Sequence, residues 1–459
     1  MTKKKLHIKT WGCQMNVYDS QRMADVLAPL GYAETGEAAD ADLIILNTCH
    51  IREKATEKVF SELGRMRPHK LRKEKAGGRM ALAVAGCVAQ AEGAEILRRD
   101  KHVDMVVGSQ AYHQLPEMIA NWERANGTAR IINTDFPAEP KFDFLPAARA
   151  HSGASAYVAV QEGCDKFCSF CVVPYTRGAE YSRPAADIIS EIKTLIAAGV
   201  CEVNLLGQNV NAWHGAAPDG KTWDLGTLMF RLAELDGLQR IRYVTSHPSD
   251  MHDMLYRAHG EIPQLMPYLH LPIQNGSDKI LAAMNRKHTR DDYLRIIDRL
   301  RCIRPDMAFS SDFIVGFPGE SDADHRQTME VVETVGYGSA YSFKYSRRPG
   351  TPAAKAGKQV AEEIKDARLQ ELQAKLYADQ TAFNAAKIGT VMPLLLDRTG
   401  KRENQLQGHS PWLQTVNVTA PERLLGQIVD VRIIAATQNS LTGEVIMLTP
   451  DSHAQSHAA

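Results

Sequence analysis

Three closely spaced cysteines carry the strongest chemical signal in this chain. Cys164, Cys168 and Cys171 form a Cys-x3-Cys-x2-Cys motif, and no fourth cysteine follows at a matching spacing. Thiolates are the usual protein ligands of iron–sulfur clusters. Three of them can hold three irons of a cubane, which leaves the fourth iron open to chelate a small molecule. A fourth cysteine would instead have indicated a closed electron-transfer cluster or a structural zinc site.

A second candidate group consists of Cys13, Cys49 and Cys87, which lie far apart in the sequence. Each follows an apolar, strand-like segment, and these segments cover residues 6–10, 43–48 and 81–86. A lone cysteine beside a strand is usually a packing residue, but here the placement repeats three times. Apolar runs separated by helices predict a parallel sheet, whose strands end at one edge where ligands bind. We therefore expect the three thiols to converge in space.

The N-terminal part of the chain is typical of a doubly wound parallel α/β domain. A helix-like stretch over residues 20–30 ends at Gly31, a suitable C-terminal cap. Residues 133–156 are rich in Pro, Ala, Gly and Ser and show no clear periodicity, which indicates a linker.

Six strand-like runs follow this linker, with helix-like segments such as 186–198 and 291–303 between them. The runs cover residues 157–160, 203–206, 241–244, 268–271, 308–313 and 340–345. Six β/α units are too few to close an eight-stranded barrel, so we expect a partial, TIM-like (β/α)6 barrel that is open at one side. The Cys-x3-Cys-x2-Cys motif then follows the first barrel strand, at the end where such folds place their active sites.

Beyond a helical run over residues 361–387, the chain becomes rich in β-structure. Strand-like segments at 391–396, 413–419 and 427–434 predict a small C-terminal β-barrel. Small β-barrels often present basic and aromatic side chains to nucleic acid. The candidates are Arg398, Lys401, Arg402, Arg423 and Trp412. A solvated charged rim with a packing tryptophan is the alternative interpretation.

Composition sets further limits. The chain has 459 residues, enough for roughly three domains. Lys plus Arg (54) equals Asp plus Glu (54), so any nucleic-acid partner must be recognised by a local patch. We find no signal peptide and no apolar run long enough to span a membrane, and therefore expect a cytoplasmic protein without membrane contact. In that compartment eight cysteines do not indicate disulfides, and we assign Cys201 and Cys302 to packing.

The motif after the first barrel strand resembles that of the radical S-adenosylmethionine (SAM) superfamily. Nearly the whole chain is similar to the methylthiotransferase family within it. The resemblance rests on the segments Trp11–Ser20, Asn47–Glu53, Gly86–Cys87 and Gln161–Gly178. It implies an N-terminal cluster domain at 5–124, a linker at 125–149, a radical SAM core at 150–382 and a TRAM domain at 385–448. Residues Lys70–Arg79 depart from the family as a lengthened loop, and Gln405–Val416 fits the TRAM pattern loosely.

The resemblance also implies two [4Fe-4S] clusters. Cys13, Cys49 and Cys87 would hold an auxiliary cluster, and the catalytic set Cys164, Cys168 and Cys171 would hold the cluster that binds and cleaves SAM. Strand-end residues would contact SAM, namely Gly207, Gln208, Gln274, Asp312, Gly316 and Gly319. Each of these could instead be a turn glycine or a strand-end cap. A zinc site or an oxidation-sensitive cysteine cluster is the alternative for the Cys164 motif.

Family motifs also indicate the substrate. Gln14–Ser20, Leu206–Ala212 and Tyr345–Ala353 are typical of the subfamily that acts on prenylated adenosine in tRNA. The expected reaction is methylthiolation of carbon 2 of N(6)-dimethylallyladenosine at tRNA position 37, with one SAM as methyl donor and one as source of a 5′-deoxyadenosyl radical. The expected partners are the tRNA anticodon loop, a reducing electron donor protein, and a sulfur donor or cluster-assembly proteins. Threonylcarbamoyl adenosine of tRNA, an aspartate of a ribosomal protein, and a non-catalytic RNA-binding iron–sulfur protein are the alternatives.

Overall fold

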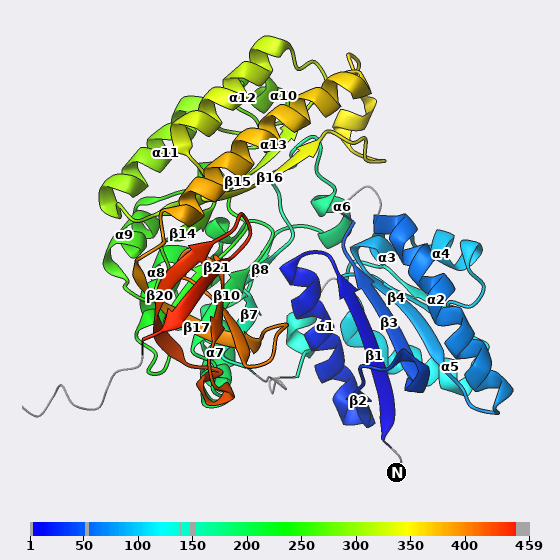
Figure 1. The fold of residues 1–459 in the computed structure, drawn as a ribbon. Helices are drawn as coiled ribbons and strands as arrows, with labels where there is room; N and C mark the ends of the chain where they lie inside the picture. Colours follow the sequence, from blue (N-terminus) through cyan, green and yellow to red (C-terminus); the bar gives the residue numbers. More distant parts are fainter. Residues whose placement is uncertain (1–2, 51–54, 138, 147–152, 447–459) are drawn as a thin grey trace, which may run out of the picture.

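The computed structural model describes residues 3–50, 55–137, 139–146 and 153–446. An N-terminal α/β domain lies beside a larger central domain, and a small β-barrel packs against the central domain (Figure 1). No helix in these described stretches is both long and apolar enough to cross a membrane.

The N-terminal domain is built on a six-stranded sheet in the order β2-β1-β3-β4-β5-β6, with every pair parallel. Helices α1 and α5 pack on one face and α2, α3 and α4 on the other, so each face has its own apolar core. The predicted doubly wound parallel fold is confirmed. The strands are β1 (Lys4–Trp11), β2 (Tyr32–Glu34), β3 (Leu43–Thr48), β4 (Ala81–Gly86), β5 (Met105–Val107) and β6 (Ile131–Asn133). The helices are α1 (Gln14–Leu27), α2 (Ala55–Lys75), α3 (Cys87–Glu92), α4 (Ala94–Arg99) and α5 (Leu115–Arg124).

Three expectations for this domain need adjustment. Helix α1 begins directly after Cys13, earlier than expected, although Gly31 does end the helical stretch in the left-handed conformation. The expectation of a lengthened loop at Lys70–Arg79 is wrong for the first half of that range, because α2 continues to Lys75. Lys and Arg favour helices, and the buried Lys70 pairs there with the carboxylate of Asp104. The N-terminal sheet also extends into the range 125–149, since β6 pairs with β5.

The central domain contains all six expected strands in two three-stranded parallel sheets, β13-β10-β7 and β14-β15-β16. A parallel bridge connects Ile241 of β13 to Leu265, which lies just before β14, and one apolar core fills the space between strands and outer helices. Among the described strands, β7 and β16 are the first and last strands of the barrel and do not pair with each other. The barrel is therefore open between them, which confirms the predicted partial (β/α)6 barrel. The strands are β7 (Ser155–Ala159), β10 (Glu202–Leu206), β13 (Arg240–Tyr243), β14 (Tyr268–His270), β15 (Ala308–Val315) and β16 (Ser339–Lys344).

Helices and short hairpins complete the central domain. The helices are α6 (Val173–Arg177), α7 (Ala185–Ala197), α8 (Leu225–Ala233), α9 (Asp253–Glu261), α10 (Asp278–Ala283), α11 (Arg290–Ile303) and α12 (Asp322–Val335). Two small antiparallel pairs lie outside the barrel, β8 (Gln161–Glu162) with β9 (Tyr181–Ser182) and β11 (His214–Ala216) with β12 (Thr222–Asp224). Cys302 lies in α11 as expected but is exposed, so its assignment to packing is wrong.

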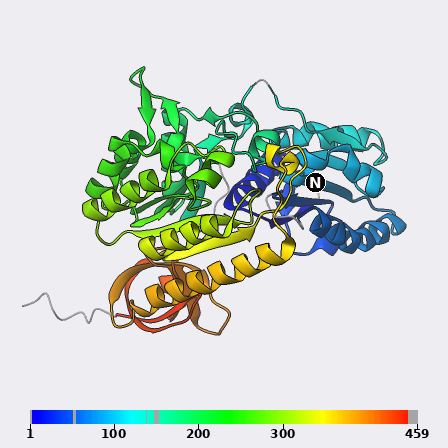
Figure 2. The same ribbon diagram turned by 90° about the horizontal axis from the view of Figure 1, so that it is seen from above.

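The long helix α13 (Glu362–Ala385) leads from the central domain to the C-terminal barrel (Figure 2). Five strands close this barrel in the order β17-β18-β19-β21-β20, as the sequence predicts in outline. They are β17 (Val391–Thr399), β18 (Gln405–His409), β19 (Thr415–Thr419), β20 (Ile428–Ala436) and β21 (Leu441–Val445). The strands β18 and β21 are additions to the three expected ones.

Two buried arginines of β13 hold the C-terminal barrel against the central domain. Arg242 donates to the carbonyl oxygens of Ser410 (2.7 Å) and Pro411 (2.8 Å), and Arg240 donates to that of His409 (3.0 Å). The buried carboxylate of Glu202 accepts from Arg242 at 2.9 Å. Glu202 therefore balances one of the two arginine charges of β13, while the guanidinium N–H groups bind carbonyl oxygens of the barrel.

We predict that Arg242→Met lowers the free energy of unfolding by about 3 kcal/mol, because it strips a buried carboxylate of its main partner. The value is at the low end for such a change because Arg240 remains 3.9 Å from Glu202. Urea denaturation checks this. The exposed pair of Arg257 with Glu261 provides the control, and Arg257→Met should cost at most about 1 kcal/mol. Equal losses in the two variants would contradict the role of Arg242.

Candidate cluster and cofactor sites

The structure brings Cys13, Cys49 and Cys87 together at one edge of the N-terminal sheet. They follow β1, β3 and β4, which are neighbours in the sheet. Cys13 precedes the first turn of α1, and Cys87 is the first residue of α3. The Cys49 thiol is in hydrogen-bonding contact with both other thiols. The expected convergence is thus confirmed, beside the point where the chain order in the sheet reverses.

Negative charge is shared unevenly among these thiols. Contact with Cys49 lowers the pKa of Cys87 to about 6, and the positive charge of Arg177 adds to this shift while burial opposes it. The same contact and the same charge lower the pKa of Cys13. Hydrogen bonding to its two neighbours, together with burial, raises the pKa of Cys49. Because the thiolate is the form that binds metal, two of the three ligands are prepared for it.

Two buried asparagines and one glycine lock the loops that carry these cysteines. Asn47 Nδ2 donates to the Asn16 carbonyl (2.9 Å), and Asn16 Nδ2 donates to Asn47 Oδ1 (3.1 Å). The Cys13 thiol donates to Asn16 Oδ1 (3.2 Å). Gly86 has a φ of 85°, and a Cβ atom there would lie 2.3 Å from Asn47 Oδ1. Sequence analysis assigns no role to these asparagines. The signal that could have identified Asn47 is a polar residue near the end of the apolar, fully buried strand β3.

The second trio, Cys164, Cys168 and Cys171, lies on the loop between β8 and α6. Cys168 Sγ accepts from Arg286 Nη1 (3.6 Å), and Cys171 Sγ accepts from the backbone N–H of Val173 (3.4 Å). Burial raises the pKa of Cys164 to about 11 and that of Cys171 to about 12. Metal binding must therefore displace protons from these thiols.

A close backbone contact shapes the start of this loop. Gly163 has a φ of 72°, and a Cβ atom there would lie 1.9 Å from the carbonyl oxygen of Ala179. Its N–H donates to Gln208 Oε1 at 2.7 Å. A side chain at position 163 would therefore displace the loop that carries all three cysteines.

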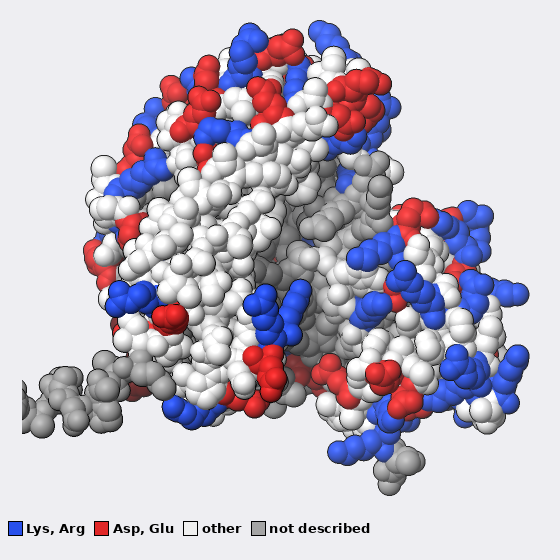
Figure 3. Space-filling view, in the orientation of Figure 1, with Lys and Arg blue, Asp and Glu red and all other residues white. Residues whose placement is uncertain are grey.

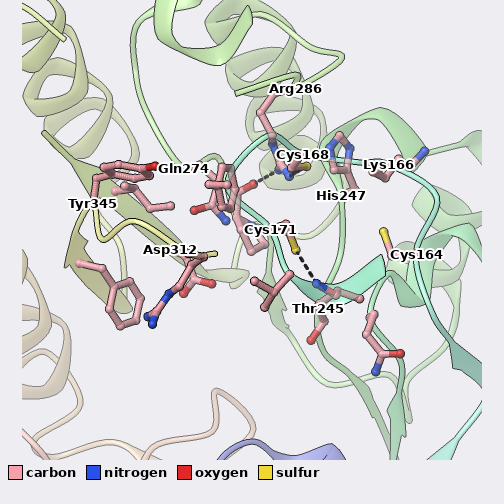
Figure 4. Close-up of a pocket in the computed structure, with 18 of the residues that line it drawn as sticks. Cys164, Lys166, Cys168, Cys171, Thr245, His247, Gln274, Arg286, Asp312 and Tyr345 are labelled. Carbon is pink, nitrogen blue, oxygen red and sulfur yellow. Dashed lines mark hydrogen bonds between the residues drawn. The ribbon is translucent and has the colours of Figure 1, made fainter. Parts of the chain in front are cut away.

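A cavity of about 510 Å³ opens beside the three cysteines, which contribute to its wall. Gln208, Gln274 and Asp312 also line it, as expected for three of the six candidate SAM contacts. The labelled side chains converge on this space from the cysteine loop and from the ends of several strands (Figure 4). Its volume is in the range of sites for small molecules and cofactors.

The three glycines predicted to contact SAM do not line this cavity. A Cβ atom at Gly207 would meet the side chain of Gln161, and one at Gly316 would meet that of Lys365. The Gly319 carbonyl accepts from Lys279 (2.9 Å). Gly207 and Gly316 permit close packing behind the strand ends, whereas Gly319 has open space around it and a φ of 86°. Contact with SAM stays a prediction for all three.

Sequence reasoning missed several polar residues of the cavity wall, among them Lys166, His247 and Arg286. Lys166 Nζ is paired with Asp250 (2.6 Å), and Arg286 donates both to Cys168 and to the carbonyl of Pro272. Burial lowers the pKa of His247, and the charge of Arg286 adds to the effect, so the imidazole is neutral. No spacing signal links these residues, because they come from different β/α units.

Both trios fit a [4Fe-4S] cluster held by three thiolates. The sulfur atoms meet at strand ends or on one loop, and N–H groups point at two of them. Within the described residues, no group of three or more His, Cys, Asp or Glu side chains could hold a single metal ion. A cubane does not need such a group, because each thiolate binds a different iron.

Comparison with known families agrees with this division of the chain. Residues 5–108 match the model of Uncharacterized protein family UPF0004, residues 158–332 that of the Radical SAM superfamily, and residues 385–446 that of the TRAM domain. The partial barrel and the cysteine loop after its first strand thus define a radical SAM protein.

The particular family follows from a curated relative. The chain is 57% identical over 448 residues to a tRNA-2-methylthio-N(6)-dimethylallyladenosine synthase of Maricaulis maris (strain MCS10), covering 97% of this chain and 98% of that protein. The chain belongs to the family of tRNA-2-methylthio-N(6)-dimethylallyladenosine synthases.

Solved structures with low sequence identity share the fold. The radical SAM methyltransferase TsrM from Kitasatospora setae, with cobalamin and a [4Fe-4S] cluster bound, has a TM-score of 0.57 at 13% identity, over 77% of each chain. The cobalamin-dependent radical enzyme OxsB, with aqua-cobalamin and SAM bound, has a TM-score of 0.51 at 9% identity, over 81% of this chain and 55% of that one.

We predict that Gly86→Ala destabilises the auxiliary site, because it forces a side chain into a left-handed backbone beside Asn47. The cost should exceed about 1 kcal/mol, and iron in the reconstituted protein should fall from about eight atoms per chain towards about four. Gly64→Ala is the control, since position 64 lies in α2 with open space around it. Full iron content in Gly86→Ala would contradict the prediction.

Proposed function

We propose that this protein methylthiolates carbon 2 of N(6)-dimethylallyladenosine at position 37 of tRNA. One SAM serves as methyl donor and a second as source of the 5′-deoxyadenosyl radical. The observation that carries the proposal is the presence of two separate three-thiol sites, one of them in the wall of a cofactor-sized cavity. The name of the 57% identical relative supports the choice of substrate.

We assign different roles to the two three-thiol sites. Cys164, Cys168 and Cys171 hold the cluster that binds SAM, and Cys13, Cys49 and Cys87 hold the auxiliary cluster that carries the sulfur to be transferred. When bound, the clusters and SAM supply the radical chemistry that an unactivated aromatic C–H bond requires. With only three thiolates at each site, each cluster keeps one iron without a protein ligand.

The remaining wall residues orient SAM and exclude water. Gln274 lies in the loop after β14 and Asp312 lies within β15. Both line the cavity, and we assign them to SAM binding. Gln208 also lines the cavity. Its side-chain oxygen accepts a hydrogen bond from the Gly163 N–H, so Gln208 also positions the start of the cysteine loop. Gly207 and Gly316 act behind them, by letting the strand ends pack closely, and Gly319 supplies a turn with a φ of 86°. The neutral His247 adds no positive charge to the cavity beside Arg286.

The C-terminal barrel is the proposed contact for the anticodon arm. Figure 3 shows basic side chains at the inner edge of the barrel, beside the hollow that separates it from the N-terminal domain. We assign RNA contacts to Arg398, Lys401, Arg402 and Arg423. Trp412 is a packing residue instead, because its indole N–H donates to the Asp306 carbonyl (2.7 Å) and Lys387 covers its ring at 3.6 Å.

Turnover by this route also needs partners. A reducing protein must supply electrons, and a sulfur donor or cluster-assembly protein must renew the transferred atom, since the reaction consumes it. We place all of these, and the tRNA, in the cytoplasm.

Nucleoside analysis tests the proposed substrate. A strain that lacks this gene should lose 2-methylthio-N(6)-dimethylallyladenosine from its tRNA and should regain it when the gene is restored, as measured by mass spectrometry. Unchanged nucleosides would overturn the proposal. Loss of a methylthio group from threonylcarbamoyl adenosine or from a ribosomal protein aspartate would redirect it to those substrates.

A cysteine variant tests the division of labour. Replacing Cys13, Cys49 and Cys87 by Ala should leave about four irons per chain and preserve 5′-deoxyadenosine formation from SAM under reducing, anaerobic conditions. The methylthio product should vanish, because the second cluster is lost. The matched control replaces Cys201 and Cys302, which lie outside both sites, and should keep product formation. Product formation by the triple variant would contradict the assignment.

A further inference from the structure

Four buried charged side chains meet where the N-terminal domain joins the central domain. Arg177 Nη2 lies 2.6 Å from Asp19 Oδ2, and Arg177 Nη1 lies 3.3 Å from Glu162 Oε1. Lys141 Nζ lies 2.6 Å from Glu162 Oε1 and 3.6 Å from Asp19 Oδ1. None of the four is more than 3% exposed. Burying four charges carries a desolvation cost of several kcal/mol for each ion, so the group is not explained by stability alone.

These charges come from three parts of the chain. Asp19 belongs to α1 of the N-terminal domain, and Lys141 lies in the segment that connects the two domains. Glu162 ends β8, and Arg177 is the last residue of α6, both in the central domain. The group therefore ties the two cluster-bearing domains to each other.

Arg177 is also in contact with the auxiliary site. Its positive charge lowers the pKa of both Cys87 and Cys13, and the helices α6 and α3, which carry Arg177 and Cys87, are packed against each other. A guanidinium has five N–H donors in a planar fork, so it can serve two carboxylates and still reach a sulfur atom. A lysine has three donors on a single nitrogen and cannot reproduce this pattern.

The other end of α6 is bound to the SAM-cluster loop. Its first residue, Val173, donates its backbone N–H to Cys171 Sγ at 3.4 Å. One five-residue helix therefore contacts a thiol of the SAM-cluster loop at its start and places a guanidinium charge beside the auxiliary-site thiols at its end. Its length is roughly 6–8 Å.

The N-terminal domain holds the last turn of α6 in place. Ser109 Oγ donates to the Thr176 carbonyl (2.5 Å), and Gln110 Nε2 donates to the Arg177 carbonyl (3.0 Å). Gln110 Nε2 also donates to Glu162 Oε2 at 2.9 Å. Both the backbone and the side chain of Arg177 are thus fixed from across the domain boundary.

We propose that Arg177 is a positioning residue that couples the two cluster sites. It fixes the spacing of the two trios through α6, and its permanent positive charge stabilises the negative charge of the auxiliary site. The inference rests on the proposed function, because it needs a second cluster at Cys13, Cys49 and Cys87. A positive charge beside a cluster favours the reduced state, so Arg177 sets the auxiliary cluster at a higher reduction potential than it would otherwise have.

The test uses the anaerobically reconstituted full chain and measures the midpoint potential of each cluster by redox titration with electron paramagnetic resonance. Arg177→Gln should shift the auxiliary potential to a more negative value and weaken retention of that cluster by about 10- to 100-fold. The SAM-cluster potential should stay unchanged. Asp19→Asn removes an anion from the same group and should shift the auxiliary potential in the opposite direction.

Two further variants separate this effect from general damage. Arg286→Lys should perturb the SAM cluster and spare the auxiliary one, because Arg286 contacts Cys168. Arg242→Lys replaces a buried, ion-paired arginine that faces the C-terminal barrel, and both potentials should stay at the wild-type value. Arg177→Lys keeps the positive charge and replaces Arg177→Gln in the test if that variant does not fold. Its auxiliary-cluster midpoint potential should stay close to the wild-type value. It should form less methylthio product per 5′-deoxyadenosine released.

The outcomes that overturn the inference are distinct from failure of the proposed function. An unshifted auxiliary potential in Arg177→Gln, or shifts of the same sign in Arg177→Gln and Asp19→Asn, would overturn it. Equal shifts of both clusters would overturn it too. A wild-type protein with only about four irons per chain would instead refute the second cluster, and with it the proposed function.

Discussion

Convergence of strand ends is the constraint on which both thiol sites depend. Parallel strands deliver their carboxyl ends to one edge, so residues far apart in sequence can meet there without long loops. In the N-terminal sheet this brings Cys49 into contact with Cys13 and Cys87. In the partial barrel it surrounds one cysteine loop with strand-end side chains. The two edges lie next to each other because α1 packs against β7 and α3 against α6.

Tight backbone turns make this convergence specific. Gly86 and Gly163 both adopt left-handed conformations in places where a Cβ atom would strike a neighbouring loop. Asn16 and Asn47 are hydrogen-bonded to each other between the segments that carry Cys13 and Cys49. Cysteine position is thus determined by contacts among loops as well as by the sheet, so a side chain at either glycine would displace a segment that carries a cysteine.

Much of this arrangement could be predicted from the sequence, because long apolar runs identify buried strands. All six barrel strands and the three cysteine-bearing strand ends were found in this way. Strands β18 (QLQGH) and β21 (LTGEV) were missed because they are short, contain glycine and have few apolar residues. The end of α2 was missed because a run of charges resembles a loop, although Lys70 is buried.

The cavity wall was harder to predict than the cysteines. Cysteine ligands can be recognised from residue type and spacing. Arg286 and His247 are distant in the sequence and become neighbours only when the barrel folds. The glycines at 207, 316 and 319 follow strands as expected, yet they do not line the cavity. Sequence periodicity locates a strand end to within a residue or two, but it does not decide which backbone face meets the ligand.

The single helix α13 fixes the distance between the cavity and the C-terminal barrel. Leu369, near its start, lines the cavity, and Asn384, near its end, donates to the Thr437 carbonyl of the C-terminal barrel (2.9 Å). The helical rise places these two residues roughly 22 Å apart, and the arginines of β13 prevent the barrel from swinging. An RNA that rests on the barrel and inserts a base into the cavity must present those two features at a matching separation. Under the proposed RNA contact, RNAs would be selected by this distance before any base is read.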